Sequence, residues 1–318
     1  MEHPFSGKII PIRIPTPFLV GDVFAYLVKD EKLVLIDTGQ HDDEAYETLR
    51  LELENENVSI SDLDEIWITH GHPDHFGQAK RLRDKSGAMI LAPEGEKANL
   101  ENNSDRELYD RLFRRIGVDK TVIQSMADQL SWIRQFQQPL KPDRWVSEND
   151  LLETGHFTFR VKHLPGHAPG HVAFCEEDFT FGGDVLLSHI STNALISFDH
   201  ETDHRNRSFL QYRESLKWIK NHGNAFFPGH GKFIPRSKEI AEKYLEEQEQ
   251  RMNHILTLIN NEPVSITELS RRLFPEAWKQ KAYFLVISEV LGFLDWGIER
   301  NLFSEIREDG ELLFQKKT

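Results

Sequence analysis

The sequence contains almost no cysteine and no long apolar run. Cys175 is the only cysteine among 318 residues, so no disulfide can form within the chain, as in proteins of a reducing cytoplasm. No uninterrupted apolar stretch reaches the about 18 to 20 residues that a membrane-spanning helix needs. The first residues also lack the basic and apolar pattern of a signal peptide. We therefore predict a cytoplasmic protein that does not enter a membrane.

Positive charge is also scarce. The chain carries 38 Lys and Arg against 52 Asp and Glu, which gives a formal net charge of −14. Such a field repels nucleic acid and anionic membranes unless a local basic patch intervenes. Nucleic acid is therefore a disfavoured partner. A small-molecule substrate is the expected partner, and the sequence is also compatible with a homodimer.

The pattern of apolar residues divides the chain into two predicted domains. Residues 1–236 alternate strand and helix patterns, which predicts an α/β domain. A charged, helical insertion interrupts this domain at about residues 94–145. The insertion either covers a functional site or packs as a surface excursion, and the sequence favours neither.

Residues 237–318 form the second predicted domain, which begins with a long helix. Ser265 and Glu268 are spaced as in a capping box, which predicts the start of another helix. Asp309-Gly310 predicts a hairpin turn between two short strands. Helices followed by a hairpin are typical of a winged-helix-like domain. Acidic residues outnumber basic ones from Val264 onward, so we expect packing against the first domain or a second subunit rather than DNA binding.

Histidine and aspartate gather where predicted strands of the first domain end. The segment "HGHPDH" crowds four such residues into six positions, and three more segments follow, "LPGHAPGH", "GGDVLL" and "FPGHG". Crowded imidazoles repel one another once they are protonated, whereas a metal ion needs several neutral imidazoles and carboxylates directed at one place. The candidate residues are His70, His72, Asp74, His75, His167, His171, Asp184 and His230.

In this order and context, the four segments resemble the motifs of the metallo-β-lactamase superfamily, especially its glyoxalase II-like hydrolase branch. The resemblance covers residues from about 10 to 236. It implies an αββα sandwich, in which two sheets pack face to face with helices outside and metals at one edge. The C-terminal part resembles the winged-helix-like extension of some members.

The resemblance also implies a role for each candidate residue. His70, His72 and His167 would hold a first metal; Asp74, His75 and His230 would hold a second; and Asp184 would bridge both. His171 would support the site without binding a metal, and Asp37 in "LIDTG" would orient a ligand imidazole.

Two divalent ions are therefore the expected cofactors, foremost Zn²⁺, while Fe or Mn also suits a site without thiolates. A hydroxide that bridges the ions would attack the substrate, and Asp74 would take up a proton.

Three activities remain open on the sequence. A dinuclear hydrolase of a small ester, thioester or lactone is favoured, because the whole second ligand set is present. The alternatives are a metal-dependent ribonuclease or phosphodiesterase and a mono-iron persulfide dioxygenase. Arg205 and Arg207 could recognise an anionic substrate, but we interpret both as solvated loop charges.

Overall fold

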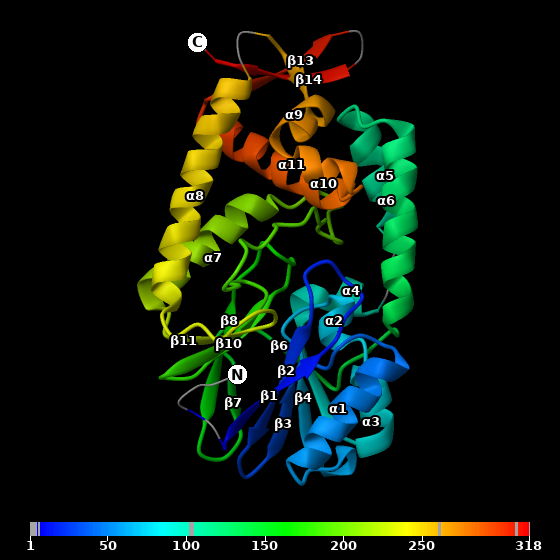
Figure 1. Ribbon diagram of the computed structural model, residues 1–318, viewed down its shortest axis with the longest axis vertical. Coiled ribbons are helices and arrows are strands. Elements are labelled where there is room, and N and C mark those ends of the chain that lie inside the picture. Colours follow the sequence, from blue (N-terminus) through cyan, green and yellow to red (C-terminus); the bar gives the residue numbers. More distant parts are fainter. Residues whose placement is uncertain (1–4, 6, 102–104, 260–261, 309–310, 318) are drawn as a thin grey trace.

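Two β-sheets lie face to face in the computed structural model, which describes residues 5, 7–101, 105–259, 262–308 and 311–317 (Figure 1). The first sheet has the order β1-β2-β3-β4-β5-β6, over Ile9–Ile14, Val23–Lys29, Leu33–Ile36, Glu65–Trp67, Met89–Pro93 and Arg144–Val146. The second sheet has the order β11-β10-β9-β8-β7, over Ala225–Pro228, Phe179–Gly183, Val172–Cys175, Thr158–His163 and Leu151–Glu153.

Aromatic side chains fill the space between the two sheets. The ring of Trp67 in β4 lies 5.4 Å from that of Phe159 and 5.2 Å from that of Phe174, both in the second sheet. Tyr26 of β2 lies 5.2 Å from Phe181 of β10, measured between ring centroids. Burying large rings on facing sheets is a major source of stability for such a sandwich.

Helices cover the outer faces of both sheets. Helix α1 (Asp43–Asn55) begins where the side chain of Asp42 accepts a hydrogen bond from the backbone of Ala45. It packs on the first sheet together with α3 (Ala79–Ser86), and α7 (Ser208–His222) packs on the second. The predicted αββα sandwich is therefore confirmed.

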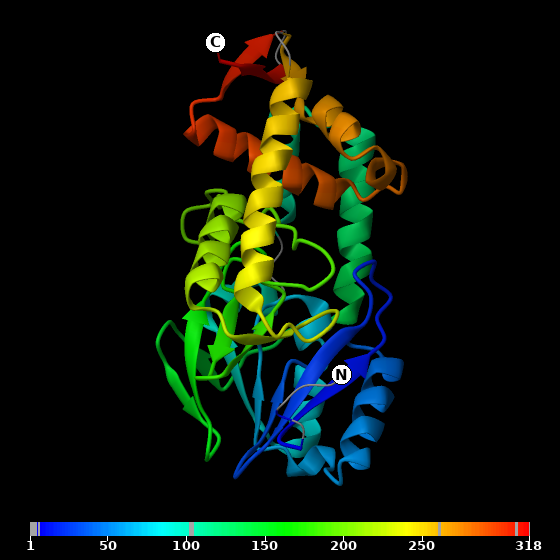
Figure 2. The same ribbon diagram turned by 60° about the vertical axis from the view of Figure 1, so that its left-hand side comes forward.

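The insertion and the C-terminal part share one apolar core with the second sheet. The insertion holds α4 (Lys97–Leu100), α5 (Arg106–Arg115) and α6 (Lys120–Ile133), and the buried side chains of α5 and α6 join those of α7 in this core. The C-terminal elements of the same core are α8 Ser237–Leu258, β12 Val264–Ser265, α9 Ile266–Leu273, α10 Pro275–Lys279, α11 Tyr283–Glu299, β13 Phe303–Glu308 and β14 Glu311–Lys316. Both views show α8 bridging the sandwich and the C-terminal helices (Figures 1 and 2).

The C-terminal elements follow the predicted order of helices and a hairpin. Ser265 caps α9 by accepting a hydrogen bond from the backbone of Glu268, as the capping box predicts. β14 pairs antiparallel with β12 and with β13, and the predicted turn at Asp309-Gly310 lies outside the described residues. The assignment to a winged-helix-like domain stays a prediction.

Ion pairs fasten α11 to the rest of the molecule. Both terminal nitrogens of Arg205 donate to the carboxylate of Asp295, at 2.6 and 2.7 Å. The interpretation of Arg205 as a solvated loop charge is therefore wrong, because Asp295, on a helix far along the chain, captures it. Arg207 lies 3.6 Å from Glu299 and stays more than half exposed.

No helix among the described residues is both long and apolar enough to cross a membrane.

Candidate metal centre

The candidate ligands come together because of the direction of the strands that carry them. β3, β4 and β5 run parallel to one another, as do β10 and β11. The carboxyl ends of parallel strands meet at one edge of a sheet. The loop after β4 carries the "HGHPDH" segment, and Asp184 and His230 follow β10 and β11. Pro73 starts the short helix α2 (Pro73–Phe76), whose first turn carries Asp74 and His75.

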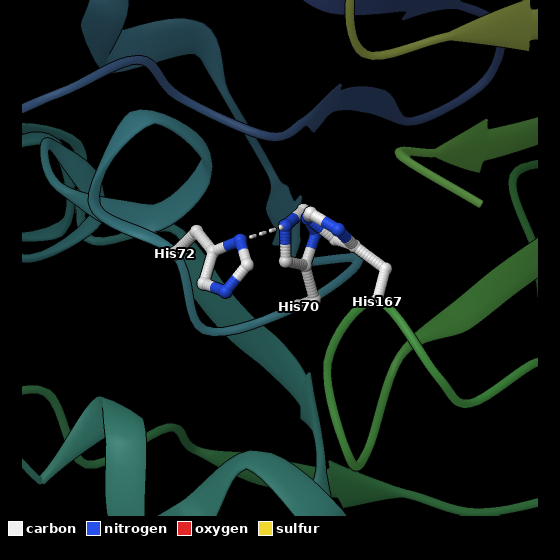
Figure 3. Close-up of side chains that lie close together, drawn as sticks. All are labelled: His70, His72 and His167. Carbon is white, nitrogen blue, oxygen red and sulfur yellow. Dashed lines mark hydrogen bonds between the residues drawn. The ribbon is translucent and has the colours of Figure 1, made fainter. Parts of the chain in front are cut away.

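A first group consists of three histidines. The ring of His70 lies 4.5 Å from that of His72 and 5.0 Å from that of His167, and the other two rings are 4.5 Å apart. Figure 3 shows His70 between the other two, with its Nε2 facing Nδ1 of His72 at 3.0 Å. Two loops from different sheets therefore converge on this point.

A second group, which consists of Asp74, His75 and His230, lies beside the first. Nε2 of His230 is 3.2 Å from Oδ2 of Asp74, and Nε2 of His75 is 3.4 Å from Oδ1 of Asp184. Asp184 also reaches the first group, because its Oδ2 lies 3.6 Å from Nε2 of His167. The carboxylate of Asp184 thus stands between the two groups, as a bridging ligand does.

The spacing of these atoms fits metal coordination. Ligand atoms held about 2.0 to 2.1 Å from a tetrahedral ion are roughly 3.3 Å from one another. The three sets His70, His72 and His167; His70, His75 and Asp184; and Asp74, His75 and His230 each place their ligand atoms within 4.8 Å of one another. Nε2 of His75, His167 and His230 and Oδ1 of Asp184 are buried without a hydrogen-bond partner among the described residues. Buried polar atoms without partners are costly, and bound cations would satisfy them.

In four of the histidines, the ring nitrogen Nδ1 already makes a hydrogen bond within the protein. Nδ1 of His75 donates to Asp37, Nδ1 of His167 to the carbonyl of Asn193, and Nδ1 of His230 to the carbonyl of Asp22. Nδ1 of His70 lies 3.0 Å from the hydroxyl of Thr69, which itself donates to Asp37. These bonds fix the tautomer that leaves Nε2 free to bind a metal.

The electrostatics of the two groups differ. Burial, followed by the neighbouring imidazole of His167, lowers the pKa of His72 to about 3, so its ring is neutral at pH 7. Burial lowers the pKa of His230, but Asp184 and Asp74 outweigh this effect and raise it to about 10. The carboxylates of the second group therefore stabilise a positive charge at this place, and a divalent cation would supply that charge.

Asp37 and His171 lie directly behind the two groups. Asp37, which is 2% exposed, accepts hydrogen bonds from the backbone of Thr69 at 2.8 Å and from His75 at 2.7 Å. Its φ of 57° is unusual for a residue other than glycine and marks a locally strained turn. His171 accepts a hydrogen bond from the backbone of Asp184 through Nε2, so it does not offer that nitrogen to the centre.

The structure gathers all seven predicted ligands and both predicted supporting residues. It also shows two contributors that the sequence analysis missed, Thr69 and Glu96. Thr69 precedes the histidine segment, and its hydroxyl links Asp37 to His70. Glu96 is completely buried against the backbone of two ligand loops. Neither residue has a signal in the sequence, since a threonine at a strand end and a glutamate in "PEGE" are ordinary surface patterns.

Comparison with known proteins identifies the family. The model of the metallo-beta-lactamase superfamily matches residues 19–230. This chain belongs to the metallo-β-lactamase superfamily. Together with the three groups of His and Asp side chains, this membership makes the chain a metallo-hydrolase.

Relatives within the superfamily cover the chain to different extents. A protein of Bacillus subtilis, named probable metallo-hydrolase YqjP, is 30% identical over 303 residues, which cover 91% of this chain and 92% of that protein. Hydroxyacylglutathione hydrolase GloC of Haemophilus influenzae is 32% identical over 128 residues, which cover 38% of this chain and 49% of that protein. The similarity to YqjP thus includes the C-terminal part.

A solved structure shares the whole architecture. A metallo-beta-lactamase family protein from Thermus thermophilus superposes with a TM-score of 0.84 at 24% identity, covering 98% of this chain and 99% of that chain. At this level of identity the likeness concerns the fold alone. The likeness in fold extends over the helical insertion and the C-terminal elements, because it covers nearly the whole of this chain.

Proposed function

We propose that this protein uses two divalent metal ions, foremost Zn²⁺, to hydrolyse a small ester, thioester or lactone. The position of Asp184 carries the proposal, because its two carboxylate oxygens face His75 and His167, which belong to different ligand groups. A carboxylate placed in this way could bind both ions of a two-metal site.

In the proposed mechanism, seven side chains hold the ions. His70, His72 and His167 would hold one ion, Asp74, His75 and His230 would hold the other, and Asp184 would bind both. When bound, the ions acidify a water molecule to a pKa near 7 and polarise the carbonyl group of the substrate. Asp74, which is 8% exposed and not fully enclosed, accepts a proton as the carbonyl carbon is attacked and passes it to the departing group.

Exposed apolar side chains support an acyl substrate. Leu19 is 84% exposed in the loop between β1 and β2, which also contains Asp22, the partner of His230. Leu285 is 39% exposed at the start of α11, and its carbonyl accepts a hydrogen bond from Asn193, the partner of His167. The loop before β2 bonds a ligand histidine directly, and the start of α11 is linked to one through Asn193. Both segments present apolar surface that an acyl chain can cover.

The charges support the same substrate class. Asp295 neutralises Arg205, which removes one candidate cation for a phosphate or a glutathione carboxylate. The net charge of −14 disfavours a polyanion such as RNA. The relative named hydroxyacylglutathione hydrolase supports a thioester as the scissile group.

A substrate panel tests the proposal. Zinc-loaded protein is assayed against p-nitrophenyl esters of increasing acyl length, acyl thioesters and single-stranded RNA, with His72→Ala as the inactive variant. His254→Ala is the matched control, because His254 is exposed on α8. We expect hydrolysis of esters or thioesters that only His72→Ala abolishes. Cleavage of RNA with no turnover of either acyl substrate would replace this proposal with the nuclease alternative.

A further inference from the structure

Glu96 is a buried carboxylate that has no cationic partner among the residues that the structure describes. It ends the 3₁₀ turn Glu94–Glu96 after β5 and is 0% exposed. Its Oε1 accepts a hydrogen bond from the backbone of Gly170 at 2.6 Å, and its Oε2 accepts one from the backbone of Gly71 at 3.1 Å. The side chain of Asn99 donates to Oε2 at 2.7 Å. Burying a carboxylate on neutral donors alone is costly, which points to a specific task for this residue.

The two backbone groups that Glu96 binds belong to different ligand loops. Gly71 lies between His70 and His72, in the loop that follows β4 of the first sheet. Gly170 lies in the loop between β8 and β9 of the second sheet, three residues after His167. One carboxylate therefore connects the two loops that supply the three histidines of the first group.

Glycines permit this close approach. A Cβ atom added to Gly71 would lie 2.6 Å from Oε2 of Glu96, and one added to Gly95 would lie 2.7 Å from Cα of Gly170. Real Cβ atoms do not come so close to other atoms. The backbones of Gly95 and Gly170 are therefore in direct contact, and the carboxylate of Glu96 packs directly against the backbone of Gly71.

We propose that Glu96 is a positioning residue that fixes the distance of His70 and His72 from His167, and thereby sets the metal affinity of the first group. The inference rests on the ligand assignment of the proposed function. Glu96 acts through the backbone and touches neither metal nor substrate. The second group depends on it less, because Asp37 holds His75 separately.

The variant Glu96→Gln separates this role from packing. Glutamine has nearly the same size, but only one of its two terminal atoms can accept a hydrogen bond from a backbone N–H group. One ligand loop therefore loses its link. Changes in partners behind metal ligands typically weaken metal binding about 10- to 100-fold. We expect a weakening of this size for one Zn²⁺ binding event and little change in the other.

The test uses the full chain and Zn²⁺ in competition with a chelator, so that it does not depend on knowing the substrate. Glu94→Gln is the matched control, because Glu94 lies in the same turn and is exposed. Hydrogen exchange of the metal-free protein provides a second measurement, and the peptides that contain Gly71 and Gly170 are expected to exchange faster in Glu96→Gln.

Three outcomes distinguish a positioning role of Glu96 from no role and from general destabilisation. Weakening of one binding event together with faster exchange at both glycines supports the proposal. Unchanged Zn²⁺ affinities would overturn it, and so would equal weakening of both events with a lower melting temperature, which indicates general destabilisation. If Glu96→Gln does not fold, Asn99→Ala keeps the carboxylate and removes one of its donors. A smaller loss in the same single event is then expected, and no loss overturns the proposal. Failure of the proposed function instead appears as zinc-loaded wild type that hydrolyses no acyl substrate.

Discussion

Replacing Asp37 by asparagine tests how this protein prepares a histidine to bind metal. Oδ1 of Asp37 accepts a hydrogen bond from the backbone of Thr69, and Oδ2 accepts one from Nδ1 of His75 at 2.7 Å. In Asp37→Asn the amide oxygen must face the backbone N–H group, which is always a donor. The amide nitrogen then faces Nδ1 of His75 and donates to it.

This reversal moves the proton of His75 to the wrong nitrogen. When Nδ1 accepts a hydrogen bond, the neutral ring carries its proton on Nε2, the atom that lies 3.4 Å from Asp184 in the second ligand group. A protonated nitrogen cannot bind a metal. We expect a loss of Zn²⁺ affinity of about 10- to 100-fold, or about 1.4 to 2.7 kcal/mol, in the second binding event.

Competition with a chelator measures this loss directly, and Asp30→Asn is the control. Asp30 is also a buried aspartate with backbone and histidine donors, but it lies in the turn between β2 and β3. It should leave both Zn²⁺ affinities unchanged. Equal affinities in wild type and Asp37→Asn would refute the argument, because the hydrogen bond would then not control the proton on His75.

Three further predictions concern activity and stability. His72→Ala should abolish turnover and leave the circular dichroism spectrum unchanged; retained activity would remove His72 from the ligands. Arg205→Ala should lower the free energy of unfolding by about 2 kcal/mol in urea denaturation, because it leaves Asp295 partly buried without its bidentate partner; no loss would mean that the pair is energetically neutral. Burial raises the pKa of Asp30, but hydrogen bonds from His156 and its neighbours lower it well below 3.8. The stabilisation from Asp30 should therefore be complete above the pKa of the unfolded state and should fade as the pH falls toward the pKa of the folded state. The difference in unfolding free energy between wild type and Asp30→Asn should accordingly shrink in acid. A difference that stays constant with pH would contradict this linkage.

The sandwich and the ligand-bearing loops were predictable because each depends on a pattern of neighbouring residues in the sequence. Alternation of apolar residues marks strands such as β8, and the helical spacing of Ala45, Leu49 and Leu53 marks the buried face of α1. Short motifs with glycine and proline mark the turns that carry His167 and His230. Each of these signals lies within a few residues, so no knowledge of distant contacts is needed.

Contacts between distant segments were not predictable. Arg205 pairs with a residue 90 positions away, and Glu96 binds Gly170 across 74 positions. A charged residue in a loop gives the same local pattern whether water or a remote helix is its partner. The shared core of the insertion and the C-terminal helices is hidden for the same reason, because amphipathic helices reveal an apolar face but not the surface against which it packs.

Counting the metal bound to purified, active protein tests the two-metal account most directly. Elemental mass spectrometry should give about two divalent ions per chain, and hydrolysis of an acyl substrate should rise with the occupancy of the second ion. A single iron per chain, with oxygen consumption in place of hydrolysis, would contradict the account and favour the dioxygenase alternative.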